Sequence, residues 1–467
     1  MSTLNPLLQR IPNRRNTELV LLVAAVLIVL AAETSVEAAR DGKLSSSRLL
    51  TYAAVPLIVG IITHLVIRRV ARYADPVLLP IAVLLNGLGL VMIHRLDLGA
   101  KARAAQYGNP SPDSFAPKQV LWIALGVALF VVLILVIRDH RMLQRYAYTL
   151  AFVGLFLLVL PAVLPARFSE VNGARIWIRL PGFSVQPAEL AKILLTVFGA
   201  AYLVQKRDVL ALAGRRFLGI DFPRGRDFGP VLVVWLMCIG VLVRGHDLGT
   251  SLLFFGLFVV LLYVATERVS WVIVGVILFA GGAYLAYQIF GTVQTRVDLW
   301  LHVFQLSPYG PAQQLQQSLF GLGTGGIFGA GLGGGHPELV PLANTDYIIA
   351  SFGEEIGLFG LVGLLVLYAM LVARGFAAGL AVRDAFGKLL ASGLSFLFAL
   401  QLFVVVAGVT RLLPETGLTA PFLSYGGSSL LGSWAILALI VRISDAARRP
   451  ATTPPAALTS EQPAVRV

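Results

Sequence analysis

"NTDYIIASFGEEIGLFGLVGLLVLYAMLVAR", residues 344–374, joins three acidic side chains to a long apolar run. Asp346, Glu354 and Glu355 lie in its first half, and no charged side chain interrupts residues 357–373. A helix of this length is about long enough to cross the ~30 Å hydrocarbon core of a bilayer. Ionisable side chains inside membrane segments are costly and are usually functional. The stretch therefore predicts a membrane helix that begins at Asp346. The Asp346 side chain is expected both to cap this helix and to line a polar cavity.

The whole chain shares this apolar character. It has 467 residues, of which 57% are hydrophobic and 13% charged, whereas about a quarter of a soluble domain is charged. Only helices or closed barrels can span a bilayer, and the runs here are too continuous for alternating barrel strands. We therefore predict an all-α polytopic membrane protein with twelve transmembrane segments. They are residues 17–33, 49–68, 76–94, 118–137, 145–165, 187–205, 228–243, 248–266, 270–290, 346–374, 386–411 and 425–443.

The net charge of +13 is unevenly distributed. An even number of segments places both termini on one side, and 23 of the 37 Lys and Arg residues fall on that side, against 13 on the other. The positive-inside rule then predicts cytoplasmic termini in a cell membrane protein. The basic excess indicates contact with anionic lipid headgroups and not with nucleic acid. A single cysteine, Cys238, excludes a disulfide within the chain and a thiolate metal cluster.

Two segments lie outside the predicted spans. Residues 446–467 are rich in Pro and Thr and are predicted to be a disordered tail. Residues 291–345 form the longest stretch without a predicted helix, on the outer side, and they include "GLGTGGIFGAGLGGGHPE" (321–338). A flexible linker is one interpretation. The interleaved apolar residues favour the other, a functional loop whose glycines let backbone approach closely.

Polar residues gather at the outer ends of predicted helices. In "SVQPAELAKI" (184–193), Glu189 and Lys192 are three residues apart and can pair on one helix face. Such a pair either fixes helix packing or lines a polar cavity that opens outward, and both interpretations stay open.

Two further motifs have the same location. In "RGHDLGTS" (244–251), Asp247 suits a helix N-cap, although capping does not explain Arg244 and His246. In "LTAPFLSYGGSSL" (418–430), Gly-Gly-Ser-Ser suits either a plain turn or a helix N-terminus with free N–H groups for an anion. Clusters that converge on one side of a bundle suggest a single cavity.

These motifs resemble the SEDS family, the RodA/FtsW peptidoglycan glycosyltransferases. The resemblance covers residues 76–445 and rests on "NGARIWIRLPGFSVQPAELAK", "HDLGTS", "TGGIFGAGLGGGHPELVPLANTDYIIASFGEEIG" and "TGLTAPFLSYGGSS", which follow the family's order. The family core has ten spans. Residues 1–75, with two further spans, are therefore an N-terminal extension, as in actinobacterial RodA-like proteins.

The resemblance implies polymerisation of the glycan of lipid II outside the cytoplasmic membrane, in cell elongation and shape control, together with a class B penicillin-binding protein. This inverting transfer needs a base for the acceptor hydroxyl and cations or N–H donors for the leaving diphosphate. The sequence indicates no particular cofactor, and a divalent cation is left open. By resemblance, Glu189 and Lys192 match the family's functional Glu and Lys, and Asp247 matches the Asp of its Pro-Asp-x-Gly turn. Substrate-binding roles are expected for these three and also for Arg175, Gln186, Arg296, Glu354, Ser424, Ser428 and Ser429.

The sequence departs from the family at the catalytic base. The family's Asp precedes a Gly-x-Gly-Tyr-Gln-x-x-Gln-Ser run, and in "RVDLWLHVFQLSPYGPAQQLQQS" (296–318) its position falls at Ser307 or Leu306. Neither side chain can act as a carboxylate base. The substitute candidates are Asp298, His302, whose ordinary pKa is about 6.5, and Asp346.

Two other functions stay open. A SEDS protein without its usual Asp can serve as a scaffold or activator of the penicillin-binding partner. A flippase for lipid-linked precursors is the other alternative, although the inverted repeats common in transporters are not evident.

Overall fold

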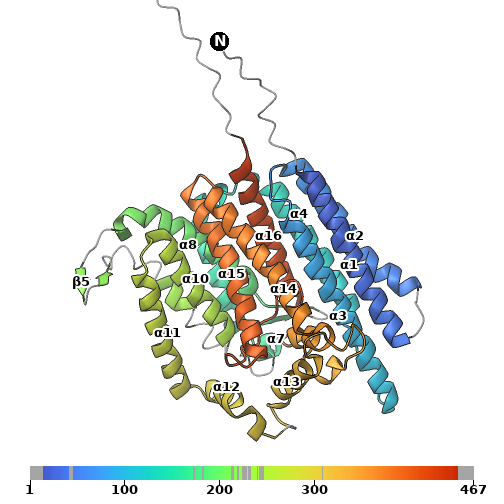
Figure 1. Cartoon of the computed structure of the whole chain (residues 1–467). Coiled ribbons are helices and arrows are strands. Elements are labelled where there is room, and N and C mark those ends of the chain that lie inside the picture. The colour runs from blue at the N-terminus through green and yellow to red at the C-terminus, as the bar shows by residue number, and fades with distance from the viewer. Residues whose placement is uncertain are drawn as a thin grey trace, which may run out of the picture.

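The computed structural model is a bundle of long helices (Figure 1). It describes residues 14–41, 46–171, 174–180, 183–211, 215–217, 220–222, 229, 233–238, 240, 247–307 and 309–450. In this part of the chain, nine helices are long and apolar enough to cross a membrane. They are α1 (Arg15–Asp41), α3 (Leu78–Gln106), α4 (Ala116–Val136), α8 (Ala188–Ala211), α10 (Leu248–Thr266), α11 (Ser270–Ile289), α14 (Ile348–Ala381), α15 (Ala385–Val409) and α16 (Gly427–Arg448).

The predicted all-α membrane fold is confirmed. Two more predicted segments coincide with helices α2 (Ser46–Val70) and α6 (Ala147–Val163), which are not among those nine. Half of the predicted segment 228–243 lies outside the described residues, so the count of twelve stays a prediction. The first three residues of the predicted tail, 446–448, belong to α16, and residues 451–467 are outside the described part.

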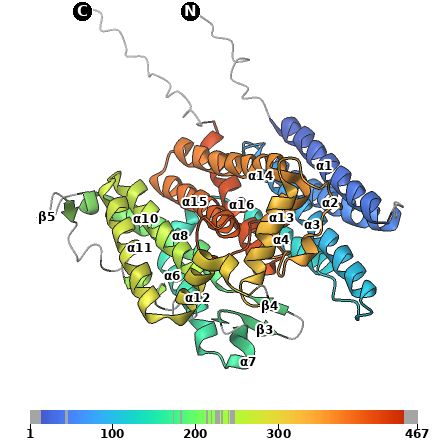
Figure 2. The same ribbon diagram turned by 60° about the horizontal axis from the view of Figure 1, so that its bottom comes forward.

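Short elements fill the connections. Helices α5 (Met142–Arg145) and α7 (Ala166–Ser169) flank α6. Three antiparallel hairpins follow: β1 (Glu170–Val171) with β2 (Ala174–Arg175), β3 (Ile178–Leu180) with β4 (Phe183–Val185), and β5 (Arg215–Phe217) with β6 (Ile220–Phe222). Strand β4 leads directly into α8 and packs against α16 (Figure 2).

The prediction that residues 291–345 are non-helical is wrong. This outer segment contains α12 (Gly291–His302), the 3₁₀ turns η2 (Val303–Gln305) and η3 (Pro337–Leu339), and α13 (Gln313–Gly325). Leu315, Leu319 and Leu322 recur at helical spacing on α13 and pack into the core beside α14. The Gln-rich sequence hid this amphipathic helix because it lacks a long apolar run.

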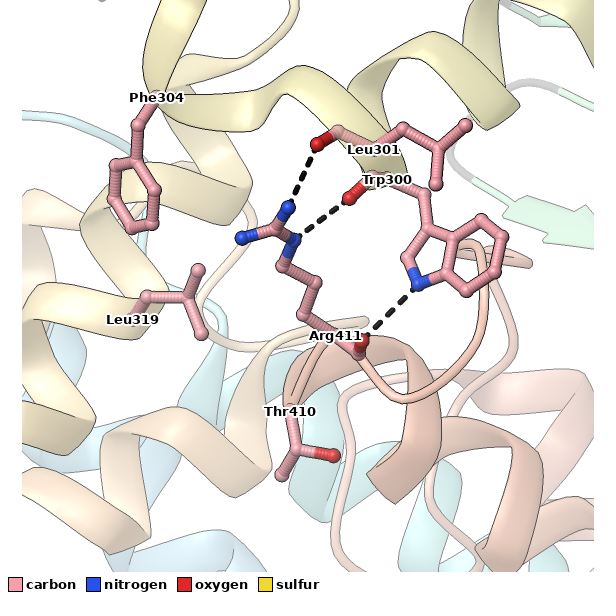
Figure 3. A pocket seen from close by; sticks show the side chains of 6 residues that line it. All are labelled: Trp300, Leu301, Phe304, Leu319, Thr410 and Arg411. Carbon is pink, nitrogen blue, oxygen red and sulfur yellow. Dashed lines mark hydrogen bonds between the residues drawn. The ribbon is translucent and has the colours of Figure 1, made fainter.

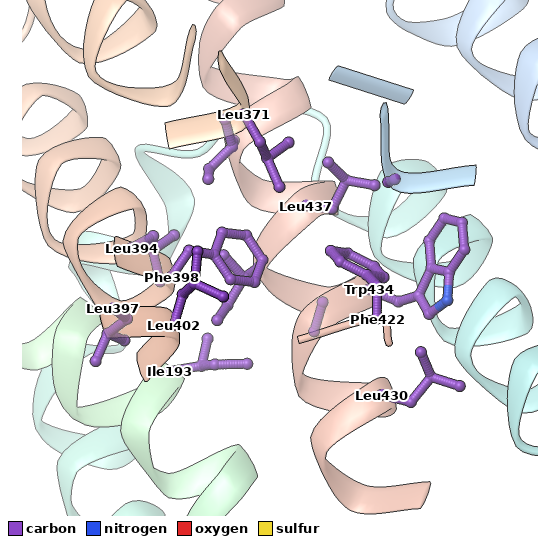
Figure 4. Close-up of a cluster of buried hydrophobic side chains, with 14 of the residues drawn as sticks. Ile193, Leu371, Leu394, Leu397, Phe398, Leu402, Phe422, Leu430, Trp434 and Leu437 are labelled. Atoms are coloured by element: carbon purple, nitrogen blue, oxygen red, sulfur yellow. The ribbon is translucent and has the colours of Figure 1, made fainter. Parts of the chain in front are cut away.

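A cluster of aromatic side chains packs in the core of the bundle (Figure 4). Phe422 lies edge-on to Trp434 of α16 at 5.6 Å and near Phe398 of α15 at 5.8 Å, measured between ring centroids. Trp434 also meets Phe130 of α4 at 5.6 Å. Such edge-to-face pairs add to the burial of the rings. They fix the segment between α15 and α16, which carries several of the polar residues considered below.

The two ends of the bundle differ. Arg15, at the start of α1, donates to the Ala74 carbonyl, and Arg448, at the end of α16, pairs with Asp75. Because Ala74 and Asp75 are neighbours, the first and last described helices start and finish on the same side of the bundle. We call this side the terminal end. Helices α12 and α13 lie at the opposite, outer end (Figures 1 and 2). This arrangement agrees with an even number of crossings.

Candidate functional site

A buried ion pair opens α8. The Nζ of Lys192 lies 2.5 Å from Oε2 of Glu189, as the three-residue spacing predicts, and both side chains are more than nine-tenths buried. Lys192 also donates to Oε1 of Gln401 on α15 at 2.9 Å, and Gln401 donates to the Thr419 carbonyl at 2.8 Å. The ammonium group therefore ties α8 to α15 and to the segment before α16.

Asp247 is the N-cap of α10, as predicted. Its Oδ1 accepts from the Thr250 amide at 2.9 Å, and its Oδ2 accepts from Nε2 of Gln186 at 3.0 Å. Burial raises the pKa of Asp247, while the hydrogen bonds from Thr250 and the charge of Arg296 act in the opposite direction. Arg244 and His246 lie outside the described residues.

Of the two interpretations of Gly-Gly-Ser-Ser, the structure shows the helix N-terminus, because α16 begins at Gly427. The Ser428 hydroxyl oxygen accepts a hydrogen bond from the backbone N–H of Gln186 at 2.7 Å. This bond joins the first turn of α16 to the residues just before α8. The Ser429 hydroxyl is buried and has no hydrogen-bond partner among the described residues. Ser424 donates to the Thr345 carbonyl at 2.7 Å, next to Asp346.

Asp346 lies beside Glu415 and Arg296. Burial, and then the negative charge of Glu415, raise the pKa of Asp346 to about 7, and Arg296 opposes them. The predicted capping role of Asp346 is wrong, because α14 begins at Ile348 with Tyr347 at the N-cap position. Tyr347 instead donates its hydroxyl to Oε2 of Glu415 at 2.5 Å. The half-buried Asp346 carboxyl is therefore suited to take up a proton near neutral pH.

Arg296 connects these groups. Its guanidinium donates to the carbonyls of Glu415 and Thr416 at 3.3 and 3.4 Å. Its positive charge opposes the rise in pKa that burial causes at both Asp247 and Asp346. We call the polar residues of this region the outer polar cluster. Its members are Gln186, Glu189, Lys192, Asp247, Arg296, Asp346, Glu415, Ser424, Ser428 and Ser429.

Arg411 fastens Arg296's helix to the bundle (Figure 3). The Arg411 side chain donates to the carbonyls of Trp300 and Leu301, each at 2.7 Å, and the Trp300 indole donates back to the Arg411 carbonyl at 3.0 Å. A cavity of about 470 Å³ lies beside these three hydrogen bonds, and Phe304 and Leu319 also line it. The end of α15 thus sets the position of α12, one turn from Arg296.

Five of the sequence-predicted residues lie apart from the cluster. Asp298 and His302 are exposed on α12, as is Ser307 after it. Arg175 is exposed on β2 and pairs with Glu170 at 3.1 Å. Glu354 accepts from the His336 amide at 2.6 Å, beneath the glycine-rich segment. Among the three candidate bases, Asp346 alone joins the cluster.

Sequence reasoning missed Glu415. An isolated acid in "RLLPETG" (411–417), directly after a membrane helix, was the available signal. Its proximity to Asp346 depends on how α14 and α15 pack, because 69 positions separate the two residues. Local sequence therefore could not pair them.

The glycine-rich segment 321–338 is packed and is not a linker. A Cβ on Gly325 would lie 2.1 Å from the Gly353 carbonyl oxygen, so only glycine allows this approach to α14. Glu355 accepts from the Gly333 amide at 3.0 Å and from Nε of Arg95 at 2.6 Å. The segment thus uses both Glu354 and Glu355 as anchors.

In the part of the chain that the structure describes, no three His, Cys, Asp or Glu side chains come together in a group that could hold a metal ion. The cations available at the outer polar cluster are the side chains of Lys192 and Arg296.

Residues 75–449 match the model of the FtsW/RodA/SpoVE cell cycle protein family. The chain belongs to this family. It is 52% identical to the peptidoglycan glycosyltransferase RodA of Mycobacterium tuberculosis over 95% of this chain and 93% of that protein. It is 48% identical to the RodA of Mycobacterium leprae over 98% and 97% of the two chains.

Solved structures show the same fold. A chain of a peptidoglycan synthase complex that coordinates polymerization and crosslinking is 28% identical, with a TM-score of 0.62 over 81% of this chain and 99% of that one. The rod-shape-determining protein RodA of Thermus thermophilus is 26% identical, with a TM-score of 0.51 over 79% and 96%. Family membership and the apolar helices together identify an integral membrane protein.

Proposed function

We propose that this protein is a peptidoglycan glycosyltransferase that polymerises lipid II glycan strands at the outer face of the cytoplasmic membrane, in cell elongation and shape control. The RodA relatives, which match almost the whole chain, support this function. The structural observation that carries it is the outer polar cluster. It combines a carboxyl group of raised pKa with two cationic side chains at the ends of several helices.

The basic excess supports the orientation. Lys and Arg are concentrated at the terminal end, which the positive-inside rule assigns to the cytoplasm. The outer polar cluster then opens on the side where the glycan strand is assembled. The class B penicillin-binding partner is part of the proposal, and the similarity to a chain of a peptidoglycan synthase complex supports it.

Asp346 is the proposed base. Its carboxylate would take the proton from the acceptor sugar hydroxyl as the hydroxyl oxygen attacks the anomeric carbon. The bond from that carbon to the diphosphate oxygen breaks with its electron pair, and the configuration inverts. A base with a pKa of about 7 is well matched to this transfer at neutral pH.

The leaving diphosphate needs positive charge. Lys192 and Arg296 supply it as side chains, and the first turn of α16 offers amide N–H groups at Ser428 and Ser429. Glu189 orients Lys192, and Asp247 orients Gln186. Arg175 and Glu354 lie away from the cluster, so no step is assigned to them.

The test is strand synthesis from lipid II by the purified full chain, alone and with its class B penicillin-binding partner, with products resolved on a gel. Asp346→Asn should lower the rate about 10²- to 10⁴-fold, the usual contribution of a general base. Asp298→Asn and His302→Ala should retain most activity, because both side chains are exposed. Asp113→Asn, which alters an exposed pair with Lys118, is the matched control.

Two results would reject parts of this proposal. An active Asp346→Asn variant would remove Asp346 as the base. A wild-type chain that makes no strands with or without its partner, under conditions where a family member is active, would reject the polymerase. If deleting the gene then still impaired wall synthesis, the scaffold function suggested by Ser307 would replace it.

A further inference from the structure

Helices α1 and α2 enclose a groove that the rest of the described chain leaves open. Its volume is about 300 Å³, and Leu22 and Val26 of α1 face Leu57 and Ile61 of α2 across it. Leu57 and Ile61 are about half exposed, as expected of side chains that meet lipid. Both helices precede residue 75, where the family match begins. The groove is therefore a feature of the N-terminal extension.

Two polar side chains close the groove towards the terminal end. His64 lines it and is 4% exposed, and its Nδ1 lies 2.7 Å from Oε1 of Glu18. Its Nε2 is buried without a hydrogen-bond partner among the described residues. Arg68 also lines the groove, one helical turn further along α2, and is exposed. A buried ring nitrogen without a partner is costly, which indicates that a ligand supplies the partner.

The groove's shape and charge specify the ligand. An apolar channel that ends in a cation fits an amphiphile with a hydrocarbon chain and an anionic headgroup. The channel is open beside Gly60, because a Cβ built there would meet only Leu22, at 3.5 Å. Arg68 lies at the terminal end, where the basic residues concentrate and where the anionic headgroups of a cytoplasmic leaflet would be.

We propose that this groove is a binding site for an anionic glycerophospholipid. One acyl chain lies along Leu22, Leu57 and Ile61, the phosphate pairs with Arg68, and the headgroup or glycerol region completes the hydrogen bonding of His64. The neutral ring accepts a hydrogen bond at Nε2 and the charged ring donates one, so a headgroup with both hydroxyls and oxygens suits either form.

The experiment is native mass spectrometry of the full-length chain in detergent, titrated with dioleoyl phosphatidylglycerol or dioleoyl phosphatidylcholine. The two lipids have the same chains and differ in net charge. The wild-type chain should retain the anionic lipid more strongly. Arg68→Ala should weaken that lipid about fivefold and abolish the preference. Arg69→Ala removes the same charge from a neighbour that does not line the groove, and should leave binding unchanged.

A second pair of variants tests the channel without altering charge. Gly60→Phe should fill it and weaken both lipids, whereas Gly60→Ala fits beside Leu22 and should change neither. Equal retention of the two lipids by the wild-type chain would overturn the proposal, as would equal effects of Arg68→Ala and Arg69→Ala. A polyprenyl phosphate that binds more tightly than phosphatidylglycerol, in an Arg68-dependent way, would overturn the glycerophospholipid assignment.

Discussion

Arg40 donates a hydrogen bond to the carbonyl of Gly335 at 2.9 Å. Arg40 belongs to α1 of the N-terminal extension, whereas Gly335 lies in the glycine-rich segment that leads to Asp346. Arg95 of α3 donates to the same carbonyl at 2.6 Å. One backbone oxygen therefore accepts hydrogen bonds from both the N-terminal extension and the family core. The extension is thus part of the support for the outer segment.

The contact between α1 and this segment can be tested at Gly333. Both Gly333 and Gly331 have positive φ, at 85° and 89°, so alanine at either is strained by about 1–2 kcal/mol. A Cβ on Gly333 would also lie 2.8 Å from the Ala39 Cβ, whereas one on Gly331 would have no atom within 4 Å. Gly333→Ala should therefore lower the free energy of unfolding by about 1–3 kcal/mol more than Gly331→Ala. Equal losses in thermal unfolding of the two variants would show that α1 does not constrain the segment.

The neighbours of Asp346 should set the pH dependence of strand synthesis. Activity needs the carboxylate, so kcat/KM should rise with pH to a plateau above about 7. The negative charge of Glu415 raises the pKa of Asp346, and Arg296 lowers it. Glu415→Gln should therefore move the rising limb to lower pH, and Arg296→Gln should move it to higher pH. Two profiles that shift in the same direction, or not at all, would exclude Asp346 as the titrating base.

Asp346 should also affect stability, with the opposite sign to its effect on activity. Its pKa is raised from 3.8 to about 7 in the folded chain, so the folded state favours the protonated form. The stability that this group contributes is complete below pH 3.8 and is lost as pH rises through about 7. Asp346→Asn, which cannot ionise, should unfold at a higher temperature than wild type above pH 7 and at a similar temperature near pH 4. Destabilisation above pH 7 would contradict this account.

Features that depend on nearby residues were predictable from the sequence. The Glu189–Lys192 pair and the Asp247 cap each follow from spacing within one helical turn. Most of the long apolar helices follow from composition in the same way. These predictions succeed because helix geometry fixes which neighbours along the chain share a face.

Features that depend on packing between distant segments were not predictable. One such feature is the proximity of Glu415 to Asp346. Another is the pair of hydrogen bonds that Arg40 and Arg95 donate to the Gly335 carbonyl. The helical state of α13 was missed for a related reason. Its apolar side chains Leu315, Leu319 and Leu322 are too sparse for a membrane segment. They stabilise a helix only because α14 lies beside them and lets them pack into the core.

The Glu189–Lys192 pair leaves a structural and a functional interpretation, which a double-mutant cycle can separate. Removing one partner leaves an uncompensated buried charge, so Glu189→Gln and Lys192→Met should each destabilise the chain by about 3–5 kcal/mol. The double variant removes both charges and should recover most of that loss. The exposed Glu170–Arg175 pair, treated identically, should show a coupling of only about 0–1 kcal/mol. If Lys192 binds the leaving diphosphate, the double variant should be well folded and still inactive in strand synthesis. A double variant that regains both stability and activity would show that the pair serves packing alone.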